Sequence, residues 1–209
     1  MEICLLCNSN QTTLYYQEKN RSFYNCNSCG SVFVPSKQLP HQDDEKKRYE
    51  NHQNDIEDPG FQNFVRPIVT AVQNQYTKEA LGLDFGAGTG PVITKLLSEK
   101  GYHLALYDPF FHPDTSVLDT TYDFIVCCEV IEHLHTPLKE FKQLRQLLKD
   151  QGTLYCMTDL LPEKAAFGSW YYKNDFTHVI FYTPKSLAWI QEKIGFNELT
   201  IQGRLITFK

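Results

Sequence analysis

The sequence predicts an α/β protein with a mostly parallel sheet and a small metal-binding module near its amino end. A short apolar run at residues 81–85 leads directly into three closely spaced glycines and a helix start. Further apolar runs at 103–107, 122–128 and 153–158 alternate with helical patterns, as in parallel βαβ units. Two C-x-x-C pairs near the amino end indicate the metal-binding module.

Length and composition limit the classes of protein that remain. A chain of 209 residues can bury one sizeable core and carry a small extra module. Its 42% hydrophobic and 22% charged residues are typical of a soluble globular protein, and its net charge of -5 argues against a broadly basic nucleic-acid-binding surface. No apolar stretch reaches the length of a membrane span, and no basic segment followed by an apolar one opens the chain, so we expect a cytoplasmic protein without membrane contacts.

Four of the seven cysteines form two pairs, Cys4 with Cys7 and Cys26 with Cys29, separated by eighteen residues. This is the spacing of a tetrahedral Zn(Cys)4 site, and we expect residues 1–36 to form a zinc ribbon whose metal is structural. Redox-active dithiols or disulfides are the alternatives, but neither pair opens a helix in a βαβ setting. The other cysteines fall in apolar runs and are expected to be inert core residues: Cys127, Cys128 and Cys156.

The glycine-rich turn after residues 81–85 permits two interpretations. Gly86, Gly88 and Gly90 allow positive φ and close approach of the backbone to a ligand, but they also suit a plain tight turn between a strand and a helix. Pro91 stands where the dinucleotide fingerprint G-x-G-x-x-G requires its third glycine, which disfavours a pyrophosphate cradle. Pro91 instead suits the first turn of a helix.

The segment before the main domain is expected to be helical. We expect residues 37–76 to form a lead-in or lid and residues 77–209 the main domain. Apolar residues recur at helical spacing across 61–72, which predicts an amphipathic helix packed on the main domain. The polar run 41–48 is either a solvated linker or a helix start, and 49–54 either covers a ligand or forms a surface helix.

The main domain should contain helices at residues 91–100, 137–149 and 184–193. A third strand, if present, is short and lies near 116–118. The pattern of 198–208 predicts an antiparallel hairpin at the edge of the sheet.

Acidic residues follow two of the predicted parallel strands. Asp108 comes directly after 103–107, at the position where a carboxylate meets ribose hydroxyls in nucleotide-binding folds. The alternative is an Asx-turn or N-cap aspartate before Pro109. Glu129 ends the next central strand at the same carboxyl edge. Asp119 and Thr120 are candidates for the adenine pocket by position alone.

Together these motifs resemble those of class I S-adenosylmethionine-dependent methyltransferases across residues 60–209. The resemblance rests on Asp84-x-Gly86-x-Gly88-x-Gly90, on Asp108, and on Glu129-Val130-Ile131-Glu132-His133 in that order. It implies a Rossmann-like methyltransferase fold, with a mostly parallel sheet closed by a C-terminal antiparallel hairpin, and S-adenosylmethionine as cofactor. The residues implied to bind that cofactor are Asp84, Gly86, Ala87, Gly88 and Gly90 for its methionine part, Asp108 for its ribose and Glu129 for its sulfonium side, with Pro109 as a further cofactor-binding residue.

Methyl transfer from a sulfonium requires mainly proximity, alignment and exclusion of water, but an oxygen or nitrogen acceptor must also lose a proton. The insertion 167–178 is dense in aromatic and titratable groups, and its Trp170, Tyr171 and Tyr172 are candidates to line an acceptor pocket. His178 is the leading general base because its ordinary pKa is near neutral, and Tyr172 and Asp175 are further catalytic candidates. The alternative is that the aromatics only pack the loop and His178 satisfies a backbone carbonyl.

A second metal site is a further hypothesis. Glu129, Glu132, His133 and the distant His178 resemble the E-x-x-E-H plus histidine set that binds a divalent cation in small-RNA 3′-terminal 2′-O-methyltransferases. The same segment also resembles that of ubiquinone-pathway O-methyltransferases, where a catalytic metal need not follow. The acidic balance of the chain does not favour RNA.

Three functions follow from these patterns. The first is a small-molecule methyltransferase with a zinc module like those of some sugar C-methyltransferases and ribosomal RNA methyltransferases. The second is an RNA methyltransferase that grips RNA with the ribbon, and the third is a non-catalytic module that keeps the cofactor pocket. The sequence leaves open the acceptor, the methylated atom (carbon, oxygen or nitrogen) and the oligomeric state.

Overall fold

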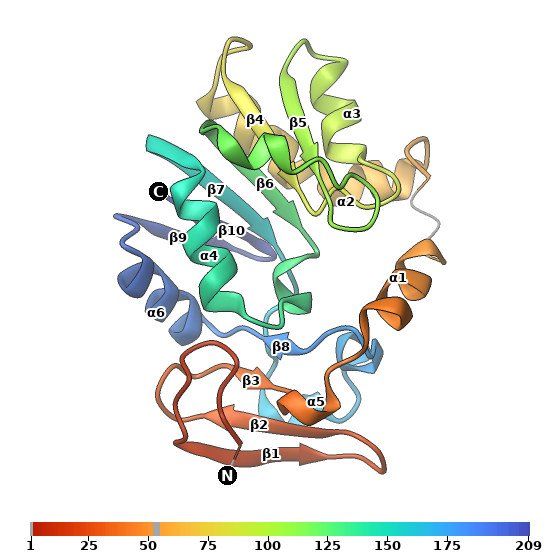
Figure 1. Cartoon of the computed structure of the whole chain (residues 1–209), viewed down its shortest axis with the longest axis vertical. Helices are drawn as coiled ribbons and strands as arrows, with labels where there is room; N and C mark the ends of the chain where they lie inside the picture. The colour runs from red at the N-terminus through yellow and green to blue at the C-terminus, as the bar shows by residue number, and fades with distance from the viewer. Residues whose placement is uncertain (1, 52–54) are drawn as a thin grey trace.

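A six-stranded sheet forms the centre of the molecule in the computed structural model, which describes residues 2–51 and 55–209 (Figure 1). The strand order is β5-β4-β6-β7-β10-β9. The first four strands are parallel to one another, and β10 is antiparallel to both β7 and β9. The mostly parallel sheet and its C-terminal hairpin are therefore confirmed. The strands are β4 (Leu81–Phe85), β5 (His103–Tyr107), β6 (Tyr122–Cys128), β7 (Leu148–Met157), β9 (Leu199–Gln202) and β10 (Leu205–Phe208).

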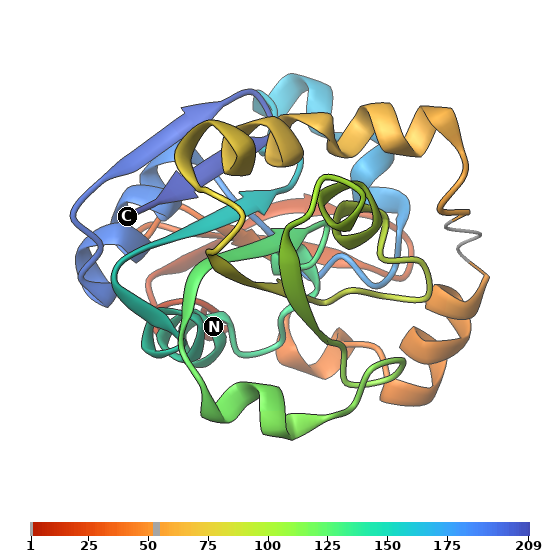
Figure 2. The same cartoon turned by 90° about the horizontal axis from the view of Figure 1, so that it is seen from above.

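Helices cover both faces of this sheet, and the strand sequences explain why. Along β6, Phe124 and Val126 pack in a core with α2 and α3, whereas Ile125 and Cys127 pack in a second core with α4 and α6. Successive side chains of a strand point to opposite faces, so a strand that is apolar throughout needs cover on both sides. Figure 2 shows helices on both sides of the sheet. The four helices are α2 (Pro59–Gln75), α3 (Val92–Ser98), α4 (Pro137–Gln146) and α6 (Pro184–Ile194).

The amphipathic helix expected across 61–72 is confirmed as α2, which begins after the N-cap Asp58. The polar run 41–48 belongs to helix α1 (Gln42–Glu50). Within the stretch 49–54, residues 52–54 lie outside the described residues. The remaining short helices are η1 (Ser36–Gln38), η2 (Thr115–Asp119), η3 (Ile131–His133), α5 (Lys164–Phe167) and η4 (Tyr171–Asn174).

Two expectations about local structure are wrong. The helix expected over 137–149 ends at Gln146, because Leu148 pairs with Tyr122 and starts β7, while the Leu147 carbonyl accepts the N–H of Tyr122. Apolar residues at the end of a helix fit a strand equally well, and pairing with β6 decides between the two. The strand expected near 116–118 is the 3-10 helix η2, started by Asp114, whose carboxylate accepts the N–H of Ser116.

The amino-terminal residues form a second, antiparallel sheet of order β1-β2-β3-β8 below the first one (Figure 1). Strands β1 (Thr12–Gln17), β2 (Ser22–Cys26) and β3 (Val32–Phe33) come from the cysteine-rich segment, but β8 (Ile180–Phe181) directly follows the insertion 167–178. One core therefore joins the two segments: Phe23, Val32, Val34, Phe167, Tyr172 and Phe181.

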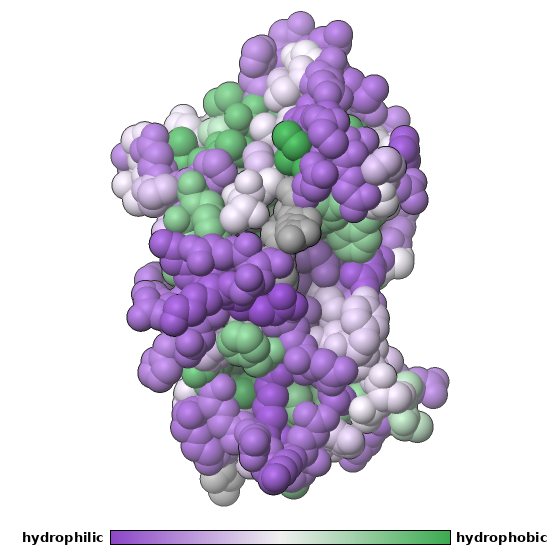
Figure 3. All heavy atoms as spheres, turned by 90° about the vertical axis from the view of Figure 1, so that its right-hand side faces the viewer, coloured by the Kyte–Doolittle hydropathy of each residue, from purple (hydrophilic) through white to green (hydrophobic). Residues whose placement is uncertain are grey.

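The outer surface on the side of α1 and α2 is predominantly hydrophilic, with small separated apolar areas (Figure 3). Among the described residues, no helix combines the length and the apolar character that crossing a bilayer requires. Cys127 of β6 and Cys156 of β7 are fully buried, as expected of core residues, whereas Cys128 at the end of β6 is only partly buried.

Candidate functional site

A cleft of about 1160 Å³ opens at the carboxyl ends of β4, β5 and β6. Helix α1, the start of α2 and residues 171–178 of the insertion complete its walls. All eight residues expected to bind the cofactor line this cleft: Asp84, Gly86, Ala87, Gly88, Gly90, Asp108, Pro109 and Glu129.

The glycine turn at the end of β4 has the backbone geometry that its sequence indicates. Gly86 and Gly88 adopt φ of 78° and 62°, in the region that favours glycine. A Cβ atom on Gly86 would lie 2.4 Å from Cγ2 of Val130, so no larger residue fits there. The Gly86 and Ala87 N–H groups both donate to the Tyr107 carbonyl, which ties the turn to the end of β5.

Asp84 lies at the floor of the cleft and is buried. Its Oδ2 accepts a hydrogen bond from the Thr94 hydroxyl of α3 at 2.7 Å. Burial raises the pKa of Asp84 to about 6, although the Thr94 hydrogen bonds act in the opposite direction. A cationic group in the cleft would relieve this cost, because it would stabilise the ionised carboxylate.

Asp108 connects the second strand to the glycine turn. One carboxylate oxygen accepts the N–H of Gly88 at 3.0 Å, and the other accepts the N–H groups of Phe110 and Phe111 at 2.8 and 3.1 Å. The Asx-turn alternative is thus present in the structure. It does not exclude a ligand, because each carboxylate oxygen has further lone pairs and Asp108 lines the cleft.

Glu129 occupies the end of β6 with a φ of 52°, an unusual value for a residue with a side chain. Its Oε1 pairs with Arg204 at 3.2 Å, and its Oε2 accepts from the Tyr172 hydroxyl at 3.1 Å. Burial raises the pKa of Glu129, and the Arg204 charge opposes that rise. Arg204 also pairs with Asp159 at 2.9 Å.

The Tyr172 hydroxyl also lies within hydrogen-bond distance of Oε1 of Glu132, which is completely buried in η3; the hydroxyl has a single proton, so it donates to one of the two glutamates at a time. Burial, followed by the Glu129 charge, raises the pKa of Glu132 well above its ordinary value. Burial likewise raises the pKa of Tyr172 far above its ordinary value. Among the described residues, Oε2 of Glu132 has no hydrogen-bond partner, which is unusual for a buried carboxylate oxygen.

Two histidines lie beside this carboxyl group. The His133 and His178 rings have centroids 4.7 Å apart. Nδ1 of His178 lies 2.7 Å from the Tyr172 carbonyl, and Nδ1 of His133 lies 3.0 Å from the Thr177 carbonyl. A carbonyl oxygen only accepts, so each Nδ1 donates its proton to the carbonyl beside it, and Nδ1 of His133 also lies 3.2 Å from the Tyr49 hydroxyl. Potential ligand atoms of Glu132, His133 and His178 lie within 4.8 Å of one another, whereas Glu129 is outside this group.

Asp175 holds the insertion to α1. Its Oδ1 accepts from the N–H and hydroxyl of Thr177, and its Oδ2 pairs with Arg48 at 2.7 Å. Burial alone would raise the pKa of Asp175, but the Thr177 hydrogen bonds and the nearby His178 and Arg48 hold it well below its ordinary value. Asp175 therefore remains ionised at neutral pH.

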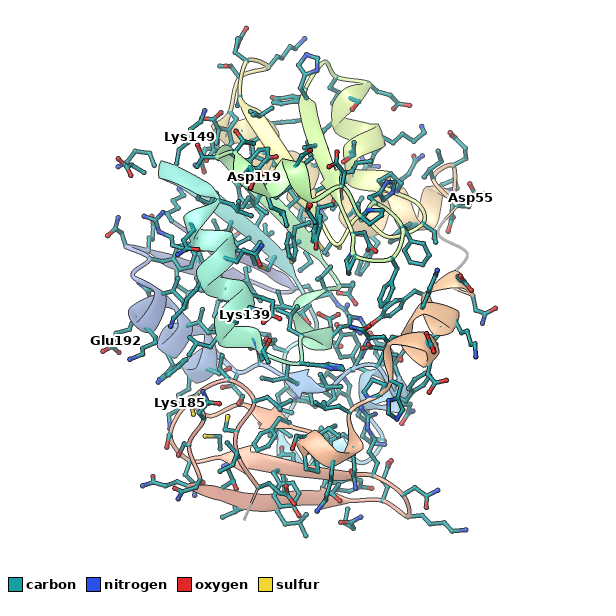
Figure 4. All side chains as sticks on the ribbon, viewed as in Figure 1. Asp55, Asp119, Lys139, Lys149, Lys185 and Glu192 are labelled. Atoms are coloured by element: carbon teal, nitrogen blue, oxygen red, sulfur yellow. The ribbon has the colours of Figure 1, made fainter. Side chains whose placement is uncertain are left out.

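The four paired cysteines converge at one end of the ribbon, where the sulfur atoms gather beside Lys185 of α6 (Figure 4). Their ligand atoms lie within 4.8 Å of one another, with Sγ–Sγ distances of 3.6 Å for Cys4–Cys29 and 3.4 Å for Cys7–Cys26. Tetrahedral zinc with bonds of about 2.3 Å separates its sulfur ligands by about 3.8 Å, so this arrangement fits the metal. None of the seven cysteines forms a disulfide.

Three expected lining residues lie elsewhere. Asp119 and Thr120 do not line the cleft and are exposed, since η2 replaces the strand expected there; Asp119 is labelled in Figure 4. Trp170 packs against Phe167 and Phe181 in the shared core, because it faces the ribbon sheet. Tyr171 and Tyr172 do line the cleft.

Sequence reasoning missed Arg48 and Arg204, which bring positive charge to the cleft. Arg204 sits in the turn between β9 and β10, where its sequence context is that of an ordinary hairpin. Only the packing of that hairpin beside β7 carries it to Glu129, so no local signal identifies it.

Comparison with known proteins agrees with the fold. The profile of a methyltransferase domain family matches residues 63–201, more than half of the chain, so the chain belongs to this family. The expected class, S-adenosylmethionine-dependent methyltransferase, is thereby confirmed. No curated protein matches the sequence.

Solved structures with a similar fold include 1,6-didemethyltoxoflavin-N1-methyltransferase from Burkholderia thailandensis, with bound 1,6-didemethyltoxoflavin and S-adenosylhomocysteine. It is 14% identical, with a TM-score of 0.57 over 93% of this chain and 97% of that chain. An O-methyltransferase family protein from the same organism is 13% identical, with a TM-score of 0.54 over 78% of this chain. Human N-acetylserotonin methyltransferase in complex with S-adenosylmethionine is 13% identical, with a TM-score of 0.51 over 71% of this chain. The chain spans 61% and 53% of the length of the last two proteins.

The buried carboxyl of Asp84 predicts a pH-dependent stability. Because its pKa is raised to about 6 in the folded state, its stabilising contribution is complete below its ordinary pKa and is lost as pH rises through about 6. Asparagine remains neutral at every pH. Asp84→Asn should therefore be more stable than the parent above pH 6, by up to about 3 kcal/mol, with little difference at pH 4.

Urea unfolding at pH 4 and pH 8 measures this difference. Asp119→Asn, at an exposed aspartate, is the control and should leave the pH dependence unchanged. A difference between Asp84→Asn and the parent that is the same at both pH values contradicts the assignment.

Proposed function

We propose that this protein transfers a methyl group from S-adenosylmethionine to a small-molecule acceptor. One observation carries the proposal: a single cleft is lined by the glycine turn, Asp108 and Glu129 and also by Tyr172 and His178. Acceptor and cofactor therefore have room side by side, which in-line methyl transfer requires. Small-molecule methylation also agrees with the acidic net charge of -5.

The cofactor side is assigned residue by residue. Asp84 and the backbone of residues 86–90 hold the methionine part, Asp108 and the neighbouring Pro109 hold the ribose, and Glu129 faces the sulfonium. A carboxylate that is costly to ionise alone, such as Asp84, suits a ligand with an ammonium group. S-adenosylmethionine supplies the electrophilic methyl group, and the protein contributes alignment and exclusion of water.

His178 is assigned as the general base that takes the acceptor proton. Its Nδ1–H is fixed by the Tyr172 carbonyl at 2.7 Å, which leaves Nε2 as the proton-accepting atom. Tyr172 keeps its proton and packs on the His178 ring, with centroids 4.1 Å apart. Both oxygens of Asp175 are engaged by Thr177 and Arg48, so we assign it to holding the loop rather than to proton transfer.

A second candidate is metal-assisted methylation of a hydroxyl. It is favoured by the unpartnered buried Oε2 of Glu132 and by the two histidines that donate Nδ1–H to carbonyls, as metal-binding histidines do. Glu132, His133 and His178 would hold a divalent cation, which would polarise the acceptor oxygen. Under this candidate His178 is a ligand and not a base.

We assign structural zinc to Cys4, Cys7, Cys26 and Cys29, and we divide the chain into a zinc ribbon (1–36), a helical lead-in (37–76) and a methyltransferase domain (77–209). A site with four thiolates has no open coordination position, so the zinc takes no part in methyl transfer.

Cofactor binding is predicted to depend on Asp108. Asp108→Ala removes a charged acceptor from the ribose hydroxyls and should weaken binding of S-adenosylhomocysteine by roughly 10- to 100-fold. Isothermal titration calorimetry measures the affinity, with Asp119→Asn as a control of unchanged affinity. Absence of binding by the parent protein at millimolar S-adenosylhomocysteine would contradict the proposed methyltransferase activity.

The two roles of His178 are separated by titration with Mn²⁺. If His178 is a base, the parent protein binds no Mn²⁺ at the cleft, and His178→Asn lowers the rate of methyl transfer by roughly 100- to 10,000-fold with the acceptor that a screen of metabolites identifies. If instead about one equivalent of Mn²⁺ binds and Glu132→Gln abolishes that binding, the metal candidate replaces the base. Glu140→Gln, at another glutamate that lines the cleft, is the matched control.

The ribbon is predicted to contain about one equivalent of zinc in the purified protein, by atomic emission. Cys26→Ser should lower the zinc content and destabilise the ribbon sheet, whereas Cys156→Ser, at a buried cysteine of β7, should leave zinc content unchanged. Zinc far below one equivalent in the parent protein contradicts the assignment.

A further inference from the structure

Arg21, at the turn between β1 and β2, reaches across to the insertion that carries His178. Its guanidinium donates hydrogen bonds to four backbone carbonyls, all within 173–178. Nη1 donates to Lys173 and Asp175 at 2.7 and 2.8 Å, and Nη2 donates to Phe176 at 3.2 Å and also to His178. One side chain of the ribbon thus binds the backbone of a segment about 150 residues away in the chain.

The chemistry of this contact favours a holding role. Residues 175–179 belong to no helix or strand, so regular backbone–backbone hydrogen bonds do not hold this segment. Four carbonyl oxygens that point toward one place repel each other unless a cation lies between them, and a planar guanidinium presents five N–H groups in a fixed fork. Burial lowers the pKa of Arg21 to about 10, so it stays charged at neutral pH.

Further contacts join the ribbon to the same segment. Lys173 is buried and pairs with Glu18 of the same turn. The Val179 carbonyl accepts the N–H of Val34, and the Val179 N–H donates to the Glu132 carbonyl. Backbone hydrogen bonds therefore connect the ribbon to Val179 and Val179 to η3. At its other end, β2 terminates at Cys26 in the cysteine cluster.

We propose that Arg21 is a positioning residue of the acceptor site and that the ribbon acts through it as a clamp on 173–178. The inference rests on the proposed function, because it assigns Arg21 to holding the segment between Tyr172 and His178. The Tyr172 carbonyl accepts the hydrogen bond that fixes the His178 ring. Tyr172 directly precedes the clamped backbone and His178 is its last residue. Among the described residues, no hydrogen bond or ion pair joins Arg21 to the glycine turn or to Asp108, so we assign the clamp to the acceptor side and not to the cofactor side.

The test combines amide hydrogen exchange with calorimetry on the full chain containing its zinc. In Arg21→Ala, amides of 173–179 should exchange at least about tenfold faster, while those of 84–92 remain unchanged. Affinity for S-adenosylhomocysteine should stay within about twofold, since distant sites act independently. Methylguanidinium at millimolar concentration should restore part of the protection, a rescue that a general loss of packing would not show.

Arg21→Lys keeps the charge and provides a second variant if Arg21→Ala does not fold. A lysine ammonium lacks the planar fork of a guanidinium and cannot bind four separated carbonyls. The amides of 173–179 should therefore again exchange faster. Cooperative thermal unfolding of this variant would show that it is folded. Arg66→Ala, at an exposed arginine of α2, is the control and should change neither measurement.

The outcomes separate this inference from the proposed function. Unchanged exchange at 173–179 in Arg21→Lys overturns the clamp, whatever the affinity for S-adenosylhomocysteine. Equal acceleration at 84–92 and 173–179 also overturns it, because it would mean general destabilisation. Failure of the parent protein to bind S-adenosylhomocysteine instead overturns the proposed function, and leaves the exchange result as a separate test of the contact itself.

Discussion

The parallel pairing of β4 with β5 and β6 is the constraint on which the rest of the site depends. Parallel strands end at the same edge of a sheet, so Asp84, Asp108 and Glu129 meet although they are separated by tens of residues in sequence. The glycine turn lies at the same edge, where Gly86 packs closely against Val130. Cover on both faces by helices keeps these strands in place.

The second half of the cleft depends on a different sheet. Strand β8 leaves the insertion to pair with β3, and the aromatic core around Phe23 and Phe167 includes Tyr172. The cysteine-rich segment is therefore not a detached module, because its packing surface is also the support of the segment with His178. This arrangement explains how about thirty-five residues, too few for a core of their own, are stabilised.

Burial of carboxyl groups in this region costs stability. Asp84 and Glu132 are both buried, and both have raised pKa values because water is excluded. Buried carboxyl groups with raised pKa values are frequent at ligand sites. There, a bound ligand can offset the free-energy cost of burial that the protein bears without it. Glu129 likewise adopts a positive φ, and such a strained conformation persists only where the surrounding structure holds it.

The sequence by itself determined the parallel sheet, its closing hairpin and the glycine turn, and it identified the cysteine quartet, because each depends on local periodicity or on spacing within a short segment. It also predicted the residues of the cleft edge, since strand ends in a parallel sheet share one side. Only the tertiary structure decided that Leu148 starts a strand, that Trp170 faces the ribbon and that Arg204 reaches Glu129. It alone brought Arg21 to 173–178. These contacts join residues distant in the chain through the packing of whole elements, and no local pattern encodes them.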